Sequence, residues 1–310
     1  MANEPTFPGS TYVGTAAGKY ISAALLSAPT IENGGVTVLE NVKGSSVLQT
    51  IDTNDLFQDA TCDFDVTRTV TMGEQILTVK DMQVNLQLCR SQFHDTWSAI
   101  EMGASAFADI PKSFEDYLLG YVAAKVAASN ETLLWTGVAG ANAYDGLVTL
   151  GAAQIVAGQQ IAAIASTALN VIDEMGKVID LIPTTVYGTE SLKLYISSNI
   201  ARNYVRALGG FAAAGLGANG TDNKGTQWYT NGNLSFDGIP VFVASGMADN
   251  TMMAAQSDNL YFGTSLLSDW QNSASVVPVH LYDGSDNVRI VMRMTAGAQI
   301  GIADDCVLYS

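Results

Sequence analysis

The longest helical pattern in this chain is SFEDYLLGYVAAKVAASNETLLWT, residues 113–136. Ser113 and Asp116 fit a capping box at its start, and Gly137 follows its end. The helical stripe has i, i+3, i+4, i+7, i+8 spacing and consists of Phe114, Tyr117, Leu118, Tyr121 and Val122. The sequence therefore predicts one helix, roughly 35 Å long at about 1.5 Å per residue.

The residues before this helix predict an arm and a β-ribbon. Residues 1–35 are polar at first and carry one short helical pattern at residues 20–26. Within residues 36–92, apolar and polar residues alternate at 64–70 and again at 82–88, and Met72-Gly73-Glu74 between them predicts a turn. A short helix and an isolated ribbon are both marginal in water. We therefore expect both segments to find a partner on another subunit.

The residues after this helix predict an α/β region and a final β region. Residues 150–275 contain two helical patterns, at 170–182 and from Ser198 to Leu208, with a strand pattern at 192–196 between them. A Gly-rich stretch at 209–232 predicts a long loop, and Phe236-Asp237-Gly238-Ile239 predicts a hairpin turn. Residues 276–310 return to β structure, with strict alternation at 288–294. The overall prediction is an α+β fold.

The composition excludes several classes of protein. The 310 residues include 14 Lys and Arg against 30 Asp and Glu, which gives a net charge of −16. Hydrophobic residues make up 48%, which argues against intrinsic disorder, and the acidic balance argues against a module that binds the phosphate backbone. Charged residues are only 14%, against about 25% in typical chains, so neutral polar residues supply much of the surface. Such a surface can be buried against copies of itself at modest desolvation cost, which hints at assembly.

The cysteines and the N-terminus point to an intracellular protein when it is made. Cys62, Cys89 and Cys306 are odd in number and widely spaced, so we expect buried or half-buried thiols rather than disulfides or a zinc site. Residues 1–6 lack the basic start of a signal peptide. The most apolar stretch, residues 161–172, is shorter than the about 20 residues of a membrane span. We expect a soluble chain.

No group of residues in the sequence matches the pattern of a known catalytic or cofactor-binding site. Cys89 with His94 and His280 with Asp283 are the candidate nucleophile and acid–base pairs, and neither belongs to a known catalytic motif. Gly215, Gly217 and Gly220 match GxGxxG, but they follow a helix where a dinucleotide site needs a strand. Residues 283–287 carry oxygen ligands, yet Met294 stands where an EF-hand needs an acid. We therefore predict no catalytic, cofactor-binding or metal site and no cofactor.

The order of these elements resembles the major capsid proteins of tailed bacteriophages, the Hong Kong 97 type fold. Family-like segments are the end of the helix at Trp135-Thr136-Gly137 followed by Asp145-Gly146-Leu147, and the strand-then-helix segment that contains Tyr195-Ile196-Ser197-Ser198-Asn199. Three further segments are Asp237-Gly238-Ile239-Pro240-Val241, the Tyr261-Phe262-Gly263-Thr264 segment with Thr where the family has Asp, and the closing strand from Arg289 to Gly297. The resemblance covers roughly residues 16–310, and the order of the segments carries it.

The resemblance implies a domain organisation. It implies an N-terminal arm at 1–35, an extended β-loop at 36–92, a peripheral domain at 93–149 and 276–310 with a spine helix at 113–136, and an axial domain at 150–275. Some relatives cross-link a β-loop Lys to an Asn of a neighbour. Lys43 and Lys80 lie in this region, but no motif marks either as reactive, so we do not extend that chemistry to this chain.

The resemblance also implies function and partners. It implies a structural, non-enzymatic subunit that self-assembles, as hexameric and pentameric capsomers, into the icosahedral head shell around double-stranded DNA. A separate scaffolding protein, a portal, decoration proteins, assembly in the host bacterial cytoplasm and a final place in the virion are also implied, with no sequence-specific DNA binding and no membrane. The alternatives are an encapsulin-like compartment, a Cys- or His-dependent enzyme using Cys89 or His94, and a surface or fibre protein.

Overall fold

The computed structural model describes residues 29–53, 59–60, 62, 70–89, 112–208, 234–264, 274–279, 285 and 287–310. The chain divides into two compact units. The first unit comprises Met1–Ser27, Met82–Ala128 and Asp269–Met294. The second comprises Ala28–Asp81, Ser129–Ser268 and Thr295–Ser310. Three elements have residues in both units, namely β4, Lys80–Cys89, α3, Lys112–Thr136, and β12, Asn287–Ile300.

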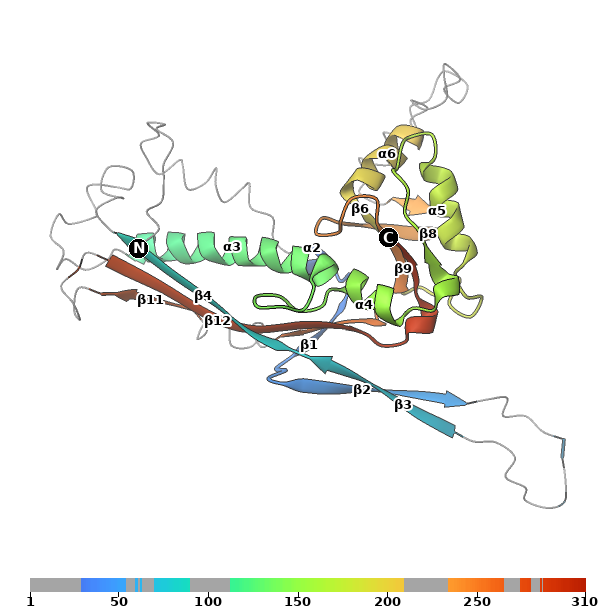
Figure 1. The fold of residues 1–310 in the computed structure, drawn as a ribbon, viewed down its shortest axis with the longest axis horizontal. Coiled ribbons are helices and arrows are strands. Elements are labelled where there is room, and N and C mark those ends of the chain that lie inside the picture. Colours follow the sequence, from blue (N-terminus) through green and yellow to red (C-terminus); the bar gives the residue numbers. More distant parts are fainter. Residues whose placement is uncertain are drawn as a thin grey trace. The chain divides into compact units, whose positions relative to one another are not determined.

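The second unit is built around a six-stranded sheet with the order β5-β13-β9-β6-β8-β7 (Figure 1). Its strands are β5 Gln160–Ile161, β13 Val307–Tyr309, β9 Met252–Gln256, β6 Leu192–Ser197, β8 Ile239–Ala244 and β7 Ser235–Phe236. The pairs β6·β8 and β13·β5 are parallel, and the pairs β6·β9, β13·β9 and β7·β8 are antiparallel. The last residues of the chain therefore form an interior strand of this sheet.

Helices α5, Val171–Asp180, and α6, Ser198–Leu208, cover one face of the sheet. Successive side chains of a strand point to opposite faces, so alternate residues of β6 meet the helices. The shared core comprises Leu192, Leu194 and Ile196 of β6, Met252 and Ala254 of β9, Met175 and Val178 of α5, and Ile200 and Tyr204 of α6. Both predicted helices and the strand between them are confirmed.

The other face of the sheet packs against helical segments of the same unit. The ring of Tyr195 lies 5.2 Å from that of Trp135, which belongs to α3. It also lies 5.4 Å from the ring of Phe242 on the neighbouring strand β8. Tyr195 Oη also donates a hydrogen bond of 2.5 Å to the carbonyl oxygen of Gly35, just after α2, Pro29–Glu32. Helix α4, Leu147–Gln154, approaches β13 through Gly151 and Leu308. The sheet therefore has a helical layer on each face.

A smaller set of strands completes the second unit. Strand β1, Thr37–Glu40, pairs in parallel with β10, Leu260–Thr264, which pairs antiparallel with the end of β12, Asn287–Ile300. Strands β2, Ser45–Thr53, and β3, Val70–Thr78, pair antiparallel over their whole length and form a two-stranded ribbon (Figure 1). Short 3-10 helices lie at Ala157–Gln159 and Ala303–Asp305.

The predicted turn at Met72-Gly73-Glu74 is wrong. These residues lie inside β3 and pair with Ile51, Thr50 and Gln49 of β2. A Cβ at position 73 would lie 2.6 Å from Thr50 Oγ1, so glycine serves a close cross-strand approach there rather than a reversal of the chain. The ribbon is therefore made by β2 and β3, and β2 was not among the predicted strands.

The first unit contains the start of α3, Lys112–Thr136, most of β4, Lys80–Cys89, strand β11, Ala274–Pro278, and the start of β12. Strand β12 pairs antiparallel with β11, from Ala274↔Met292 to Pro278↔Val288, and also pairs with β4. The predicted helix at 113–136 is confirmed with one residue added at its start. The alternating strand predicted at 288–294 is also confirmed.

The hairpin predicted at 236–241 is confirmed in detail. Asp237 and Gly238 link β7 and β8 with φ of 49° and 79°. Two positive φ values in a two-residue loop are the geometry of a type I′ turn, which matches the twist of the flanking strands. The helical pattern at 20–26, the strand at 64–69 and the loop at 209–232 lie outside the described residues.

Candidate functional site

One face of the β2–β3 ribbon is apolar and exposed. The exposed fractions are 51% for Val47, 68% for Ile51, 61% for Val70, 65% for Met72 and 51% for Ile76. Residues directly opposite each other in an antiparallel pair share a face, as do residues two apart along a strand. The register pairs Val47 with Ile76 and Ile51 with Met72, so all five side chains lie on one face, which we call the ribbon face.

A polar pair divides the ribbon face. Gln49 lies opposite Glu74, between the Val47–Ile76 pair and the Ile51–Met72 pair. Fully burying one large aliphatic side chain contributes about 2 kcal/mol. Two clusters of such side chains are left in water, so a surface that covers them gains substantial free energy of binding. That surface must also place polar groups opposite the polar pair between the clusters.

The opposite face of the ribbon is attached at one end to the rest of the second unit. Leu77 is fully buried, and a Cβ at Gly263 of β10 would lie 2.7 Å from its Cδ2 atom. Gln299 Nε2 donates a hydrogen bond of 3.1 Å to Gln75 Oε1. Farther along, an open hollow of about 320 Å³ lies behind β2, lined in part by Thr50, Tyr261 and Ile302. The ribbon is thus held at its base and only loosely backed beyond it.

Segment 29–36 is attached to the end of α3 through a buried carboxylate. Thr30 Oγ1 donates a hydrogen bond of 2.5 Å to Glu131 Oε1, and Thr30 N donates one of 3.3 Å to Glu131 Oε2. Trp135 Nε1 in turn donates to Thr30 Oγ1 at 3.0 Å. Thr30 and Trp135 are fully buried and Glu131 is 2% exposed. Burial raises the pKa of the Glu131 carboxyl above its usual value, and hydrogen bonds, those from Thr30 first, oppose that shift.

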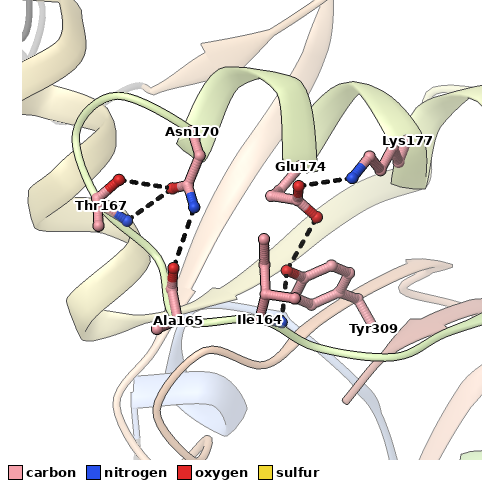
Figure 2. Close-up of polar contacts among 7 residues, drawn as sticks. All are labelled: Ile164, Ala165, Thr167, Asn170, Glu174, Lys177 and Tyr309. Carbon is pink, nitrogen blue, oxygen red and sulfur yellow. Dashed lines mark hydrogen bonds and ion pairs between the residues drawn. The ribbon is translucent and has the colours of Figure 1, made fainter.

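A second polar cluster ties the chain end to α5 (Figure 2). Tyr309 Oη accepts a hydrogen bond of 3.0 Å from the amide of Ile164 and donates one of 3.0 Å to Glu174 Oε2. The other oxygen of Glu174 forms an ion pair of 2.6 Å with Lys177 Nζ. Asn170, just before α5, receives hydrogen bonds from Thr167 and donates one to the carbonyl of Ala165. These contacts fix loop 162–170 and β13 against the helix.

The structure assembles no catalytic site from the candidate residues that it describes. Cys89 is half-buried at the end of β4, whereas His94, His280, Asp283 and the glycines of the GxGxxG match lie outside the described residues. Burial, followed by the charge of Asp305, raises the pKa of the Cys306 thiol to about 12, so this thiol is a poor nucleophile. The described residues contain no cluster of His, Cys, Asp and Glu that could hold a metal ion.

The other residues singled out in the sequence form hydrogen bonds within the subunit, lie buried or lie at its surface. Lys80 Nζ donates to the carbonyl oxygens of Gly140 and Ala143, the latter at 3.2 Å, and Lys43 is exposed. In the family-like closing strand, Arg289 Nε donates a hydrogen bond of 3.0 Å to Gln87 Oε1. Cys306 is buried and Cys89 half-buried as expected, but Cys62 is exposed. Across the described ranges, no helix is both long enough and apolar enough to cross a membrane.

The residues of the ribbon face were missed by sequence reasoning, apart from Val70. The available signal was the alternation of Val47, Gln49 and Ile51 with Leu48 and Thr50 in β2. This alternation has apolar residues on both faces, so it does not show which face is exposed. Because the sequence around Gly73 predicts a turn, it does not predict β3, the strand that pairs with β2.

Comparison with known proteins gives matches among solved structures. The sequence matches no protein-family model and no curated protein. The fold is similar to the capsid of an empty GTA particle computed with C5 symmetry, with a TM-score of 0.62 and 14% identity over 99% of this chain and 94% of that chain. It is similar to a chain of Mycobacterium phage Adephagia, with a TM-score of 0.59 and 13% identity over 97% and 94%. It is also similar to the capsid of Myoviridae phage XM1, with a TM-score of 0.54 and 11% identity over 99% of both chains.

These similarities span nearly the whole of each chain. They therefore concern the complete arrangement of helices and strands rather than one shared motif. The chain has the fold of these solved structures, among them the capsids of the GTA particle and of phage XM1, and the predicted α+β capsid fold is confirmed.

Proposed function

We propose that this chain is a major capsid protein, a structural subunit that assembles with copies of itself into the icosahedral head shell of a tailed bacteriophage. The similarity of fold to phage capsids over nearly the whole chain supports this proposal. The single observation that carries it is the ribbon face, where Val47, Ile51, Val70, Met72 and Ile76 are each more than half exposed. A surface of this kind is typical of a subunit whose apolar area is covered by a neighbour.

In the proposed assembly the ribbon of one subunit lies on a neighbouring subunit. A two-stranded ribbon gains little stability from its own cross-strand contacts. Packing against a neighbouring subunit supplies the stability that it lacks. Repetition of one such contact around closed rings gives the hexameric and pentameric capsomers that the resemblance implies. The role is therefore structural, and its specificity lies in shape and in the position of the Gln49–Glu74 pair between the apolar clusters.

The charge of the subunit suits an enclosed DNA genome. A net charge of −16 repels phosphates, and counterions screen that repulsion within about 10 Å at ordinary salt. A shell of such subunits holds double-stranded DNA without binding it in a sequence-specific way. The proposal places the mature protein in the virion and its assembly in the host bacterial cytoplasm, with scaffolding, portal and decoration proteins as partners.

The proposed domain organisation follows the resemblance. Residues 1–35 form the arm, 36–92 the extended β-loop with the β2–β3 ribbon, and 93–149 with 276–310 the peripheral domain with the spine helix at 113–136. Residues 150–275 form the axial domain. The six-stranded sheet and helices α5 and α6 support the axial assignment, with β13 contributing one strand from the chain end.

The test is to make the ribbon face polar without disturbing the subunit. In the variant Ile51→Thr/Met72→Thr, two opposed side chains lose most of their apolar area while keeping β propensity. Val138→Thr is the matched control, because Val138 is also 65% exposed but lies in the loop before α4. Sedimentation and electron microscopy measure assembly, and circular dichroism measures folding.

We expect the wild-type protein and Val138→Thr to form capsomers or shells, and the double variant to stay folded and remain as small species. A wild-type protein that stays monomeric even at about 100 μM contradicts the proposal. Shells of unchanged yield from the double variant contradict the role of the ribbon face.

A further inference from the structure

The two helices that cover the six-stranded sheet expose opposite charges. On α6, Arg202 and Arg206 are both exposed and lie one turn apart. On α5, Asp173 and Asp180 are both exposed and lie two turns apart. The buried residues of α5, among them Met175 and Val178, and those of α6, among them Ile200 and Tyr204, belong to the same core, so the charged residues face away from the sheet on both helices.

The basic side chain on α5 does not cancel this difference. Lys177 forms its ion pair with Glu174 at 2.6 Å, and Glu174 also receives the hydroxyl of Tyr309 (Figure 2). Lys177 and Glu174 together contribute no net charge. The outer surface of α5 therefore keeps the two negative charges of Asp173 and Asp180.

These four charged residues form no ion pair within the described part of one subunit, although the charge of Asp173 acts on nearby Lys177. Neither arginine forms an ion pair with another described residue, and neither does Asp173 or Asp180. The whole chain has only 14 Lys and Arg residues, so two arginines on successive turns of one surface helix are a concentrated positive charge. The two arginines lie in the same unit as Asp173 and Asp180 but form no ion pair with them.

Apolar area lies beside the acidic surface. Leu169, just before α5, is 76% exposed, and Ile172 on its first turn is 44% exposed. A contact made only of exposed ions is weak, because water and salt screen it. Apolar side chains next to the ions supply area to bury, and the ions then decide which surfaces meet.

We propose that the outer surface of α6 in one subunit binds the outer surface of α5 in another copy, with Arg202 and Arg206 facing Asp173 and Asp180. This inference rests on the proposed function, because it requires that copies of the chain assemble. Opposite charges make α6-to-α5 contacts favourable, and like charges make α6-to-α6 and α5-to-α5 contacts unfavourable. The charges therefore select one arrangement of neighbours, and the ribbon face contributes most of the buried apolar area.

Charge reversal tests this contact. The variants are Arg202→Glu/Arg206→Glu, Asp173→Arg/Asp180→Arg, and the fourfold variant that carries both reversals. Glu190→Arg/Asp304→Arg is the matched control for the aspartate reversal, since both residues are exposed in the same unit and each of these two variants replaces two acids by two bases. Light scattering gives the concentration at which half the protein is assembled, and thermal unfolding confirms that each variant is folded.

Each double reversal on one helix is expected to raise the half-assembly concentration by about tenfold or more, since two attractive pairs per contact become repulsive. The control variant is expected to change it by less than about threefold. The fourfold variant restores opposite charges across the contact, so it is expected to assemble within about threefold of wild type.

Two results would overturn the inference. One is unchanged assembly of either single-helix reversal. The other is a fourfold variant that is folded but assembles no better than its parents, since the two surfaces then bind some other charged partner. A wild-type protein that never assembles contradicts the proposed function instead, so the two failures are distinct.

Discussion

Thr30 Oγ1 lies 2.5 Å from Glu131 Oε1, although 101 residues separate the two in the chain. The pair joins the short helix α2 to the last turns of α3 inside the second unit. Trp135, one turn after Glu131, donates to the same threonine oxygen and also packs on Tyr195 of β6. One buried carboxylate thus links the segment before β1, the end of α3 and the central sheet.

Removing the Glu131 carboxylate is expected to destabilise the subunit. In Glu131→Ala the amide and hydroxyl of Thr30 both lose their buried acceptor, so the free energy of unfolding should fall by about 3 kcal/mol. Urea unfolding of the unassembled subunit measures the change. The control is Glu190→Ala, an exposed glutamate whose replacement should cost less than about 0.5 kcal/mol. Equal losses from the two variants would contradict a role for the Thr30 contact.

The same carboxyl should make stability depend on pH. Burial raises its pKa in the folded state above the ordinary value of 4.5, so folding favours the protonated form. Its contribution is complete below pH 4.5 and is lost as the pH rises through the folded-state pKa. We therefore expect the free energy of unfolding of wild type, relative to Glu131→Gln, to fall as the pH rises from 4.5. A difference that grows over that interval would show the opposite sign and refute this account.

Two glycines with different surroundings should respond differently to alanine. A Cβ at Gly297 of β12 would collide with the carbonyl oxygen of Thr78 and lie 2.9 Å from the Cα of Val79, both backbone atoms. Gly158 has nothing within 4 Å of the same position. We expect Gly297→Ala to lower the free energy of unfolding by about 2 kcal/mol or more, and Gly158→Ala to change it by less than about 0.5 kcal/mol. Thermal unfolding compares the two, and similar values would mean that β12 shifts freely over residues 78–79.

The elements with strong local signals were predictable from the sequence. Helices α3, α5 and α6 combine an apolar stripe with a start or stop residue, and these signals act within a few turns. The Asp237-Gly238 hairpin is equally local, because two residues of suitable type specify the turn. Their bounds agree with the structure to within about two residues.

The ribbon and its exposed face were not predictable because they depend on distant pairing. Alternation indicates a strand but not its partner, and β2 and β3 begin 25 residues apart in the chain. Gly73 carries a strong turn signal when it is considered alone, and only its partner Thr50 shows why glycine stands there. The link from Thr30 to Glu131 has no sequence signal either, since two polar residues 101 positions apart match no spacing rule.

The three cysteines should differ sharply in reactivity. Cys62 is exposed, whereas Cys306 is fully buried and has its pKa raised to about 12 by that burial. At pH 8 only about one Cys306 in 10⁴ is a thiolate. We expect iodoacetamide to modify Cys62 at least about a hundred times faster than Cys306 in the native protein, with peptide mass spectrometry to assign each site. The two rates should converge in urea, and comparable native rates would contradict the burial of Cys306.

Tyr309→Phe should loosen the end of the chain from α5. The hydroxyl of Tyr309 accepts from the amide of Ile164 and donates to Glu174, which is 5% exposed, so its removal leaves both groups short of a partner (Figure 2). We expect the free energy of unfolding to fall by about 2 kcal/mol and the Ile164 amide to exchange its hydrogen faster. Tyr187→Phe is the control, because Tyr187 is 48% exposed.

The position of Glu174 gives this variant a second consequence. Glu174 holds Lys177 at 2.6 Å, and that pair keeps Lys177 from neutralising Asp173 and Asp180 on the outer surface of α5. If Tyr309→Phe lets Glu174 turn away from Lys177, the released Lys177 partly cancels the negative charge of Asp173 and Asp180. Assembly should then weaken by about threefold at low salt and converge on that of Tyr187→Phe at about 1 M salt, where surface charges are screened. A loss of assembly that persists at high salt would instead trace to the displaced chain end, and light scattering at the two salt concentrations distinguishes these causes.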